Sequence, residues 1–295
     1  MLQNGVKQLL PPLECLFNAC IGLHYHPKAF KQANTIVLRK PQKNDYINPN
    51  SYRPIALLDT IGKALESIIA NRLSSLAETH GLLPKKQMGA RKKRSTETAL
   101  ELLVEQVHTI WNNGTEQVAS ILSLDISGAF PNVSHARLLH NLKKRKTPEY
   151  IVGWTESFLK DRMSSLTFDG QTSEVRSIAI GIPQGSPISP ILFLFFNADL
   201  VEICDKMGVT ATSMGFVDDI NILTYGKTTE RNCQTLSGVH AECERWARKH
   251  GATFAPKKYE LIYLIRTSRK FNITANIIFK GRTIIFKKYI RIFGI

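Results

Sequence analysis

Two adjacent carboxylates, Asp218 and Asp219, stand between two runs of mostly apolar residues, 214–217 and 220–223. Strand-like sequence on both sides of a short acidic pair predicts a tight β-hairpin with the acids at its bend. Two carboxylates about 4 Å apart repel by roughly 1 kcal/mol in water and by about 4 kcal/mol near a protein surface. A fold tolerates such repulsion where the acids hold a cation, but aspartate is also common in ordinary turns. The pair therefore indicates either a cation site or an Asp-rich turn.

A third carboxylate, Asp125, follows the apolar, β-favouring run 118–124 and precedes an expected helix that carries Val133 and Leu138. An aspartate at the end of a buried strand packs poorly and suits a metal ligand, with helix capping as the alternative. Three carboxylates in a basic chain indicate two-metal phosphoryl or nucleotidyl transfer, and hard carboxylate oxygens suit Mg²⁺. Neither a P-loop nor a His-Glu-x-x-His motif occurs, which disfavours P-loop NTPases and the common zinc proteases.

The overall charge favours a polyanionic partner. The 295 residues include 39 Lys and Arg against 24 Asp and Glu, a net charge of +15. Such an excess suits nucleic acid first and an anionic membrane surface second. No apolar run approaches the ~20 residues that a membrane span needs, and residues 1–4 open no signal peptide. Five scattered cysteines without CxxC pairs predict reduced, buried thiols, so we expect an intracellular protein, nuclear or cytoplasmic.

Two basic segments are candidates for phosphate contacts. Arg91, Lys92, Lys93 and Arg94 form a run of four cations directly before a Ser/Thr helix cap. Backbone N–H groups at a helix start and guanidinium groups both bind phosphate, although a charge run is also typical of a solvated surface. The same two interpretations apply to residues 28–43, a strand with basic ends.

The stretch 181–190 contains two glycines, three prolines and two serines, and it leads into the very apolar helix expected at 191–200. Proline is tolerated in the first turn of a helix, so Pro190 fits this start. The composition predicts a rigid loop whose backbone lies against a planar or phosphorylated ligand, with an elaborate turn as the alternative.

Hydrophobic periodicity predicts the remaining elements. We expect helices at about 13–21, 62–81, 96–111, 133–142, 151–158 and 229–250, and strands at 35–38, 52–58, 261–265, 276–280, 283–286 and 289–293. Two further short strands lie within 165–180, in a hairpin around Asp169-Gly170. The chain is long enough for one large domain or two packed subdomains.

Several motifs then occur in a fixed order. They are residues 52–55 with 62–63, 87–91 with 94–96, 124–130, 181–187, 216–219, 254–258 and 291–294. In this order they resemble the reverse transcriptase domain of non-LTR (LINE-type) retrotransposons, most closely that of fungal elements. The resemblance covers nearly the whole chain. It implies an α+β right-hand polymerase with fingers at 1–118 and a palm at 119–295. The palm would be a split βαβ, ferredoxin-like sheet with helices on one face and a helical insertion at about 134–165.

The resemblance implies RNA-directed DNA polymerase activity, in which deoxynucleoside triphosphates extend a DNA primer on an RNA template. Asp125, Asp218 and Asp219 would bind two Mg²⁺ ions, with Mn²⁺ as a possible substitute, and Lys258 would protonate pyrophosphate. No membrane and no small organic cofactor are expected. The thumb and the preceding endonuclease are missing, which favours a fragment of a larger element or a decayed copy. The alternatives are an inactive remnant that at most binds nucleic acid, and a different palm-fold enzyme.

The resemblance also implies ligand contacts. For the nucleotide it indicates Arg53, Lys63, Arg91, Phe130, Gln184 and Gly185, with Phe130 beneath the sugar 2′ position and Gln184 and Gly185 beside the nascent base pair. For nucleic acid we expect Lys92, Lys93, Arg94, Arg291 and Gly294, the last two in a primer-grip turn that ends the palm. One departure concerns Pro131, which replaces the family's usual aspartate. In the family scheme that aspartate is not a metal ligand, so its replacement leaves the chemistry possible. The proline does, however, put in question the geometry of the turn that orients Asp125.

Overall fold

The computed structural model describes residues 5–293 except 42, 44, 114–116 and 267–272. Its contacts divide the chain into two compact units, which we call unit 1 and unit 2. Unit 1 comprises Met1–Leu82 and Phe130–Leu192, and unit 2 comprises Leu83–Ala129 and Phe193–Ile295. Both units mix helices and strands. Because these units are defined by contacts and not by function, the predicted division into fingers and palm after residue 118 stays a prediction.

Unit 1 is built on a sheet with the strand order β2-β1-β4-β5, in which β6 also pairs with β4. The strands are β1 (Gln32–Arg39), β2 (Tyr52–Leu57), β4 (Arg162–Phe168), β5 (Gln171–Thr172) and β6 (Arg176–Ile178). β1 pairs antiparallel with β2 and parallel with β4. The predicted hairpin around Asp169 and Gly170 is confirmed, because both residues have a positive φ between β4 and β5.

The helices of unit 1 bury apolar side chains and one neutral histidine. They are α1 (Val6–Gly22), α2 (Thr60–Thr79), α4 (His135–Lys144) and α5 (Glu149–Leu159), joined by the short helices η2 (Lys28–Phe30) and η3 (Pro49–Ser51). Trp154 and Phe158 of α5 stack with ring centroids 5.4 Å apart, and His26 lies edge-on to both. Burial lowers the pKa of His26 to about 3, so the ring is uncharged and packs as an aromatic side chain.

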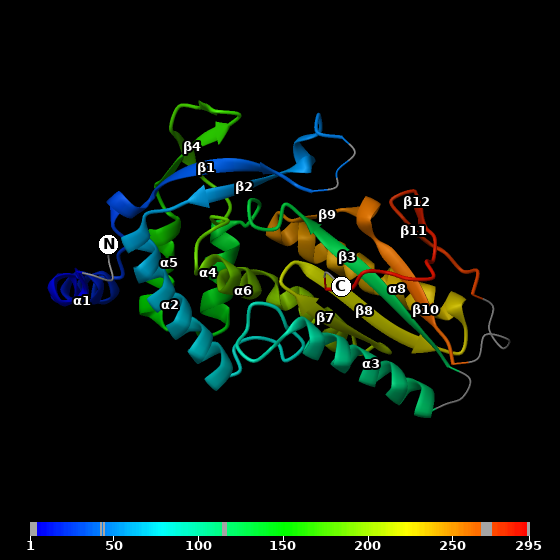
Figure 1. Cartoon of the computed structure of the whole chain (residues 1–295). Helices are drawn as coiled ribbons and strands as arrows, with labels where there is room; N and C mark the ends of the chain where they lie inside the picture. The colour runs from blue at the N-terminus through cyan, green and yellow to red at the C-terminus, as the bar shows by residue number, and fades with distance from the viewer. Residues whose placement is uncertain (1–4, 42, 44, 114–116, 267–272, 294–295) are drawn as a thin grey trace. The chain divides into compact units, whose positions relative to one another are not determined.

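Unit 2 is built on an antiparallel sheet with the order β10-β3-β8-β7, in which the short strand β9 also pairs with β3. The strands are β3 (Val118–Ser127), β7 (Ala211–Phe216), β8 (Asp219–Gly226), β9 (Thr253–Phe254) and β10 (Glu260–Leu264). The central strands β3 and β8 lie side by side over eight residue pairs (Figure 1). Both strands are buried along most of their length.

Helices pack on this sheet. The helices of unit 2 are α3 (Thr96–Asn113), α7 (Ile203–Met207), α8 (Thr229–His250) and the 3₁₀ helix η4 (Pro256–Lys258), while α6 (Ser189–Val201) contains the division between the units. Ile121 of β3 belongs to the cluster formed with α3, whereas the neighbouring Ser120 accepts a hydrogen bond from Asn232 of α8. Side chains alternate along a strand, so α8 lies on one face of this sheet and α3 covers the other. No helix among the described residues is long and apolar enough to cross a lipid bilayer.

Two sequence predictions are wrong in detail. Residues 277–279 and 282–284 form the predicted strands β11 (Ile277–Phe279) and β12 (Arg282–Ile284), but residues 289–293 form no strand. Instead, Lys287 and the backbone N–H of Arg291 donate hydrogen bonds to the side chain of Glu260, the first residue of β10. Phe293 then packs in the hydrophobic cluster that contains residues of α3. The second error concerns the cysteines: all five are free thiols, but Cys15 is exposed on α1.

A matched pair on α3 tests the core of unit 2. Leu103 is 3% exposed in the cluster with β3, whereas its neighbour Leu102 is 38% exposed. We expect Leu103→Ala to lower the free energy of unfolding by about 2–5 kcal/mol, because it removes buried methyl groups and leaves a cavity. Leu102→Ala should stay within about 0.5 kcal/mol of the parent. Urea titration followed by circular dichroism measures both, and equal losses would contradict this packing.

Candidate active site

The β7–β8 hairpin places the acidic pair at the edge of the sheet of unit 2. Phe216 of β7 pairs with Asp219 of β8, so the connecting turn consists of Val217 and Asp218. The predicted hairpin is confirmed, but only Asp218 lies at the bend, because Asp219 is already the first residue of β8. Val217 has a φ of 56°, a left-handed conformation that a β-branched residue rarely adopts. Such strain is found where the surrounding structure holds a functional turn in place.

Two buried amide side chains hold this turn. Asn197 of α6 donates a hydrogen bond of 2.7 Å from Nδ2 to the carbonyl oxygen of Val217. Its Oδ1 accepts a hydrogen bond of 2.9 Å from Nε2 of Gln87, and both side chains are fully buried. Gly89 presses on the same turn, since a Cβ added there would lie 2.7 Å from the nitrogen of Val217. Residues of the motif at 87–91 therefore help to hold the acidic turn in place.

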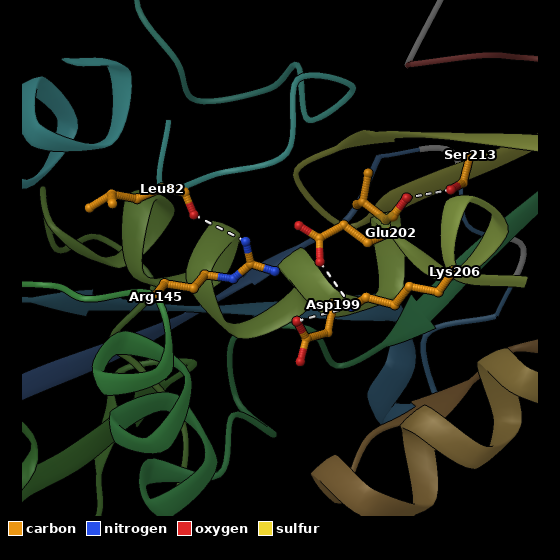
Figure 2. Close-up of polar contacts among 7 residues, drawn as sticks. Leu82, Arg145, Asp199, Glu202, Lys206 and Ser213 are labelled. Atoms are coloured by element: carbon orange, nitrogen blue, oxygen red, sulfur yellow. Dashed lines mark hydrogen bonds and ion pairs between the residues drawn. The ribbon is translucent and has the colours of Figure 1, made fainter. Parts of the chain in front are cut away.

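The last turn of α6 anchors strand β7 as well. Ser213 donates a hydrogen bond from its hydroxyl to the carbonyl oxygen of Val201 (Figure 2). A Cβ added to Gly215 would lie 2.8 Å from Cγ2 of Val201, so only glycine allows this approach. Directly after α6, Glu202 caps α7 and forms an ion pair of 2.9 Å with Lys206 of that helix (Figure 2). The strand that leads to the acidic pair is thus fixed against one helix.

Asp125 lies directly opposite Asp219 in the pairing of β3 with β8. The predicted strand end is too early, because β3 continues past Asp125 to Ser127. The carbonyl oxygen of Asp125 accepts a hydrogen bond of 3.0 Å from the backbone of Ala255. Both of its carboxylate oxygens accept hydrogen bonds of 2.9 Å from Nζ of Lys258 in η4. The Lys258 side chain is 57% exposed, so this pair is weak and open to exchange with another cation.

Crowding of negative charge is the electrostatic signature of this site. Burial, followed by the charges of Asp218 and Asp125, raises the pKa of Asp219 to about 6, while the charge of Lys258 opposes this rise. A cation placed among these groups would favour their ionised forms. The sequence-predicted carboxylates and Lys258 are therefore brought together.

The donor set fits a hard divalent cation, because it consists of carboxylate oxygens whose repulsion a cation would offset. Across the described residues, however, no three His, Cys, Asp or Glu side chains are arranged so that they could hold one ion as placed. In this arrangement Asp125 faces the ammonium group of Lys258 instead. Binding of metal by Asp125, Asp218 and Asp219 therefore remains a prediction.

The Gly/Pro loop belongs to unit 1, where β2 holds it. The backbone N–H of Ala56 donates a hydrogen bond of 2.7 Å to the carbonyl oxygen of Gln184. Gly185 has a φ of +125°, and a Cβ there would lie 2.5 Å from the carbonyl oxygen of Ala56. Only glycine satisfies both conditions. The predicted rigid loop is confirmed, whereas its contact with a ligand stays a prediction.

Glu66 holds the same loop, although no sequence motif assigned it a role. This glutamate lies on the buried face of α2, fully inaccessible to solvent. Its carboxylate accepts a hydrogen bond from the hydroxyl of Ser186, which in turn accepts one from the N–H of Ile188. Burial raises the pKa of Glu66. A charged residue at a core position of an amphipathic helix is the signal that could have identified it.

Phe130 and Pro131 also contact the Gly/Pro loop. The carbonyl oxygen of Phe130 accepts a hydrogen bond of 2.9 Å from the N–H of Ile182, and Phe130 itself is half-buried. Gly181, with a φ of +84°, has no room for a Cβ because the carbonyl oxygen of Pro131 would lie 2.5 Å away. Asp125 keeps regular strand pairing despite the proline that follows it six residues later.

The predicted basic contacts differ in exposure. In unit 1 Arg53 is exposed on β2, and Lys63 is half-buried on α2. In unit 2 Arg91 is buried and donates to the carbonyl oxygens of Pro84 (2.7 Å) and Gln87 (3.2 Å), which gives it a structural role in the loop before α3.

The remaining nucleic-acid candidates lie mostly on the surface of unit 2. Arg94 joins Arg91 by donating to backbone carbonyls of the same loop, while Lys92 and Lys93 are exposed. Arg291 is exposed and donates its backbone N–H to Glu260. Gly294 lies outside the described residues.

A family model described as "Reverse transcriptase (RNA-dependent DNA polymerase)" matches residues 38–281 of the chain. The RNA-directed DNA polymerase from mobile element jockey of Drosophila melanogaster is 32% identical over 259 residues, which cover 84% of this chain and 27% of that protein. The probable RNA-directed DNA polymerase from transposon X-element of the same species is 29% identical over 243 residues, 82% of this chain and 26% of that protein. The predicted closeness to fungal elements finds no support in these relatives.

Similarity also extends to solved structures. Telomerase from Candida albicans, in a complex with a fragment of telomeric RNA, matches with a TM-score of 0.59 at 12% identity, over 92% of this chain and 48% of that one. At this identity the likeness concerns the fold alone, and it confirms the predicted α+β reverse transcriptase fold. The chain spans roughly a quarter of the length of the two Drosophila relatives.

The raised pKa of Asp219 predicts a pH-dependent stability. In the folded chain this pKa is about 6 against an ordinary value of 3.8, so the folded state binds the proton more tightly. Stability is therefore lost as the pH rises through this window and stays low above it. With metal removed by chelator, we expect Asp219→Asn to melt at a higher temperature than the parent at about pH 7.5, with a smaller difference at about pH 5.

Differential scanning calorimetry at the two pH values measures this difference. Asp205→Asn serves as the control for removing one negative charge, because Asp205 is exposed and pairs with Lys86 away from β8. An Asp219→Asn variant that is less stable than the parent at both pH values would contradict the crowding of charge at this site.

Proposed function

Because this chain belongs to the reverse transcriptase family, we propose that it is the RNA-directed DNA polymerase domain of a non-LTR retrotransposon. Its reaction would add deoxynucleotides to the 3′-hydroxyl of a DNA primer annealed to an RNA template. The observation that carries the proposal is the pairing of Asp125 with Asp219 across β3 and β8, with Asp218 in the adjoining turn. This arrangement gathers acidic side chains at one edge of a sheet in a chain with a net charge of +15.

In this proposal Asp125, Asp218 and Asp219 hold two Mg²⁺ ions, for which Mn²⁺ is a substitute. When bound, such ions lower the pKa of an attacking hydroxyl and stabilise the charge on a leaving pyrophosphate. Lys258 contacts Asp125 through an exposed ammonium group, so it can release the carboxylate and give a proton to the leaving group. Asn197 keeps the turn of Val217 and Asp218 in place during these steps.

Unit 1 would contribute the contacts to the incoming nucleotide. Gln184 and Gly185 lie on a loop fixed by Ala56, and Glu66 holds its following residue. We propose that this backbone lies beside the nascent base pair and that Phe130 excludes a ribose 2′-hydroxyl. The proposed triphosphate contacts from unit 1 are Arg53 and Lys63. We also propose Arg91 of unit 2 as a triphosphate contact, and it is the least accessible of the three.

Basic surface residues would bind the RNA template and the DNA primer. Lys92 and Lys93 are exposed on the loop before α3, and Arg291 is exposed beyond β12. Each neutralised phosphate releases counterions, which supports affinity without sequence preference. We also propose that Arg94 and Gly294 contact nucleic acid. The RNA bound in the Candida albicans telomerase structure is consistent with an RNA partner for this fold.

The decisive experiment extends a labelled DNA primer on an RNA template with Mg²⁺. We expect Asp125→Asn to slow extension by about 10³-fold or more, because losing a ligand for developing charge costs several kcal/mol of transition-state stabilisation. Asp205→Asn is the matched control and should extend at the parent rate, since Asp205 pairs with Lys86 outside the acidic edge. Primer–template affinity should be similar in all three proteins.

Two results would overturn the proposal. One is extension by Asp125→Asn within about tenfold of the parent, a loss of only about 1.4 kcal/mol. The other is a parent chain that binds primer–template but never extends it, which is the behaviour expected of an inactive remnant.

A further inference from the structure

A cavity in unit 2 lies between α3 and the end of the sheet that is remote from the acidic edge. Its volume is about 580 Å³, which suits a small ligand, and all of its lining residues belong to unit 2. Most of them come from the second half of α3, from the segment 209–212 and from β8. Tyr225, one of these residues, lies six residues along β8 from Asp219, about 20 Å at the usual rise of a strand. The cavity is therefore separate from the proposed polymerase site.

One aromatic ring is open to this cavity. Leu223 of β8 and Ile110 of α3 line the cavity and also belong to the hydrophobic cluster of unit 2. Tyr225 follows Leu223 by two residues, so its side chain lies on the same face of the sheet. It is 38% exposed, so other side chains leave part of this ring uncovered. Bases of nucleic acids stack on aromatic rings of this kind, whatever their sequence.

Exposed polar side chains line the same cavity. Asn113, the last residue of α3, and Thr210, which precedes β7, are both exposed. The amide of asparagine offers a donor beside an acceptor, an arrangement that the edges of nucleobases also present. By contrast, Oε1 of Gln106 and Oε1 of Gln117 are buried, which closes these oxygens to a ligand. Asn113 therefore offers the most accessible amide of the lining.

The charges at this cavity favour a neutral ligand. Among the described residues that line it, the charged side chains are Lys86 and Glu105. Nζ of Lys86 forms an ion pair of 2.7 Å with Asp205, and the neighbouring Lys206 is paired with Glu202 in turn. One ammonium group of the lining thus stands against the carboxylates of Glu105 and Asp205. This balance provides no excess positive charge for a phosphate group.

We propose that this cavity binds a single nucleobase, with the ring stacked on Tyr225 and its hydrogen-bonding edge on Asn113. A free nucleoside and an unpaired base of an RNA strand supply the same ring, and the experiment separates these two sources. The proposal rests on unit 2 alone and does not depend on polymerase activity.

Ligand-observed NMR titration of the full chain with adenosine tests the site, with chelator present so that no metal binds at the acidic edge. Ribose, which lacks the base, should not bind, and adenosine monophosphate should bind no more tightly than adenosine because Lys86 is already paired. Tyr225→Leu should weaken adenosine by about tenfold, since it removes one stacked aromatic ring. The matched control is Tyr289→Leu, because Tyr289 is 85% exposed and does not line the cavity.

A matched pair of asparagines tests the polar contact. Asn113→Leu should weaken adenosine by about twofold to tenfold, the effect expected from the loss of a hydrogen bond. Asn112→Leu should bind adenosine as the parent does, because Asn112 is an exposed neighbour on α3 that does not line the cavity. Both side chains are exposed, so the fold tolerates either change.

A short RNA strand identifies the source of the base. If the cavity takes a base from RNA, an abasic nucleotide at the centre of the strand weakens binding to the parent, and this loss disappears in Tyr225→Leu. Equal binding of the two strands, with adenosine still bound, assigns the site to a free nucleoside. The proposal is overturned if the parent binds no adenosine, if ribose binds as tightly, if adenosine monophosphate binds more tightly, or if neither Tyr225→Leu nor Asn113→Leu weakens adenosine.

Discussion

Repulsion between Asp125 and Asp219, which face each other on adjacent strands, is the constraint on which the rest of unit 2 depends. The structure sets these carboxylates opposite each other at the end of eight paired residues, although burial and the charges of Asp218 and Asp125 raise the pKa of Asp219. Lys258 offsets part of this repulsion through an exposed ion pair, which is worth little in water. The remaining apolar ladder of β3 and β8 supplies the stability that keeps the acids together.

In each unit, a buried polar side chain from a distant part of the chain holds one loop or turn of the candidate site in place. In unit 2 Asn197 fixes the strained carbonyl of Val217, and in unit 1 Glu66 fixes Ser186 beside the Gly/Pro loop. Burying such groups is costly unless they are hydrogen-bonded, so each contact also specifies one conformation of the loop it holds. The Gly/Pro loop also requires glycine at position 185, since the backbone conformation there and its close approach to β2 both exclude a side chain.

Local patterns in the sequence predicted much of this structure, because hairpins, caps and amphipathic helices depend on nearby residues. The acidic hairpin, the rigid Gly/Pro loop and the long helix that ends at Gly251 follow from such patterns. The roles of Asn197 and Glu66 depend on partners 20 and 120 residues away, and periodicity alone does not reveal these. A lone asparagine in an apolar helix and a charge on a buried helix face were the available signals. The strand expected at 289–293 was wrong because alternation does not show whether a partner strand exists.

The most direct test of the account is a titration of the parent chain with Mn²⁺, followed by electron paramagnetic resonance without nucleic acid. If the acidic edge of β3 and β8 is a cation site, Asp125→Asn should weaken Mn²⁺ by more than about tenfold, since a unit charge at 4 Å near a protein surface is worth about 4 kcal/mol. Asp205→Asn, which removes an exposed carboxylate paired with Lys86, should bind Mn²⁺ as the parent does. Equal affinity in the parent and Asp125→Asn, or no binding by the parent, would contradict the account.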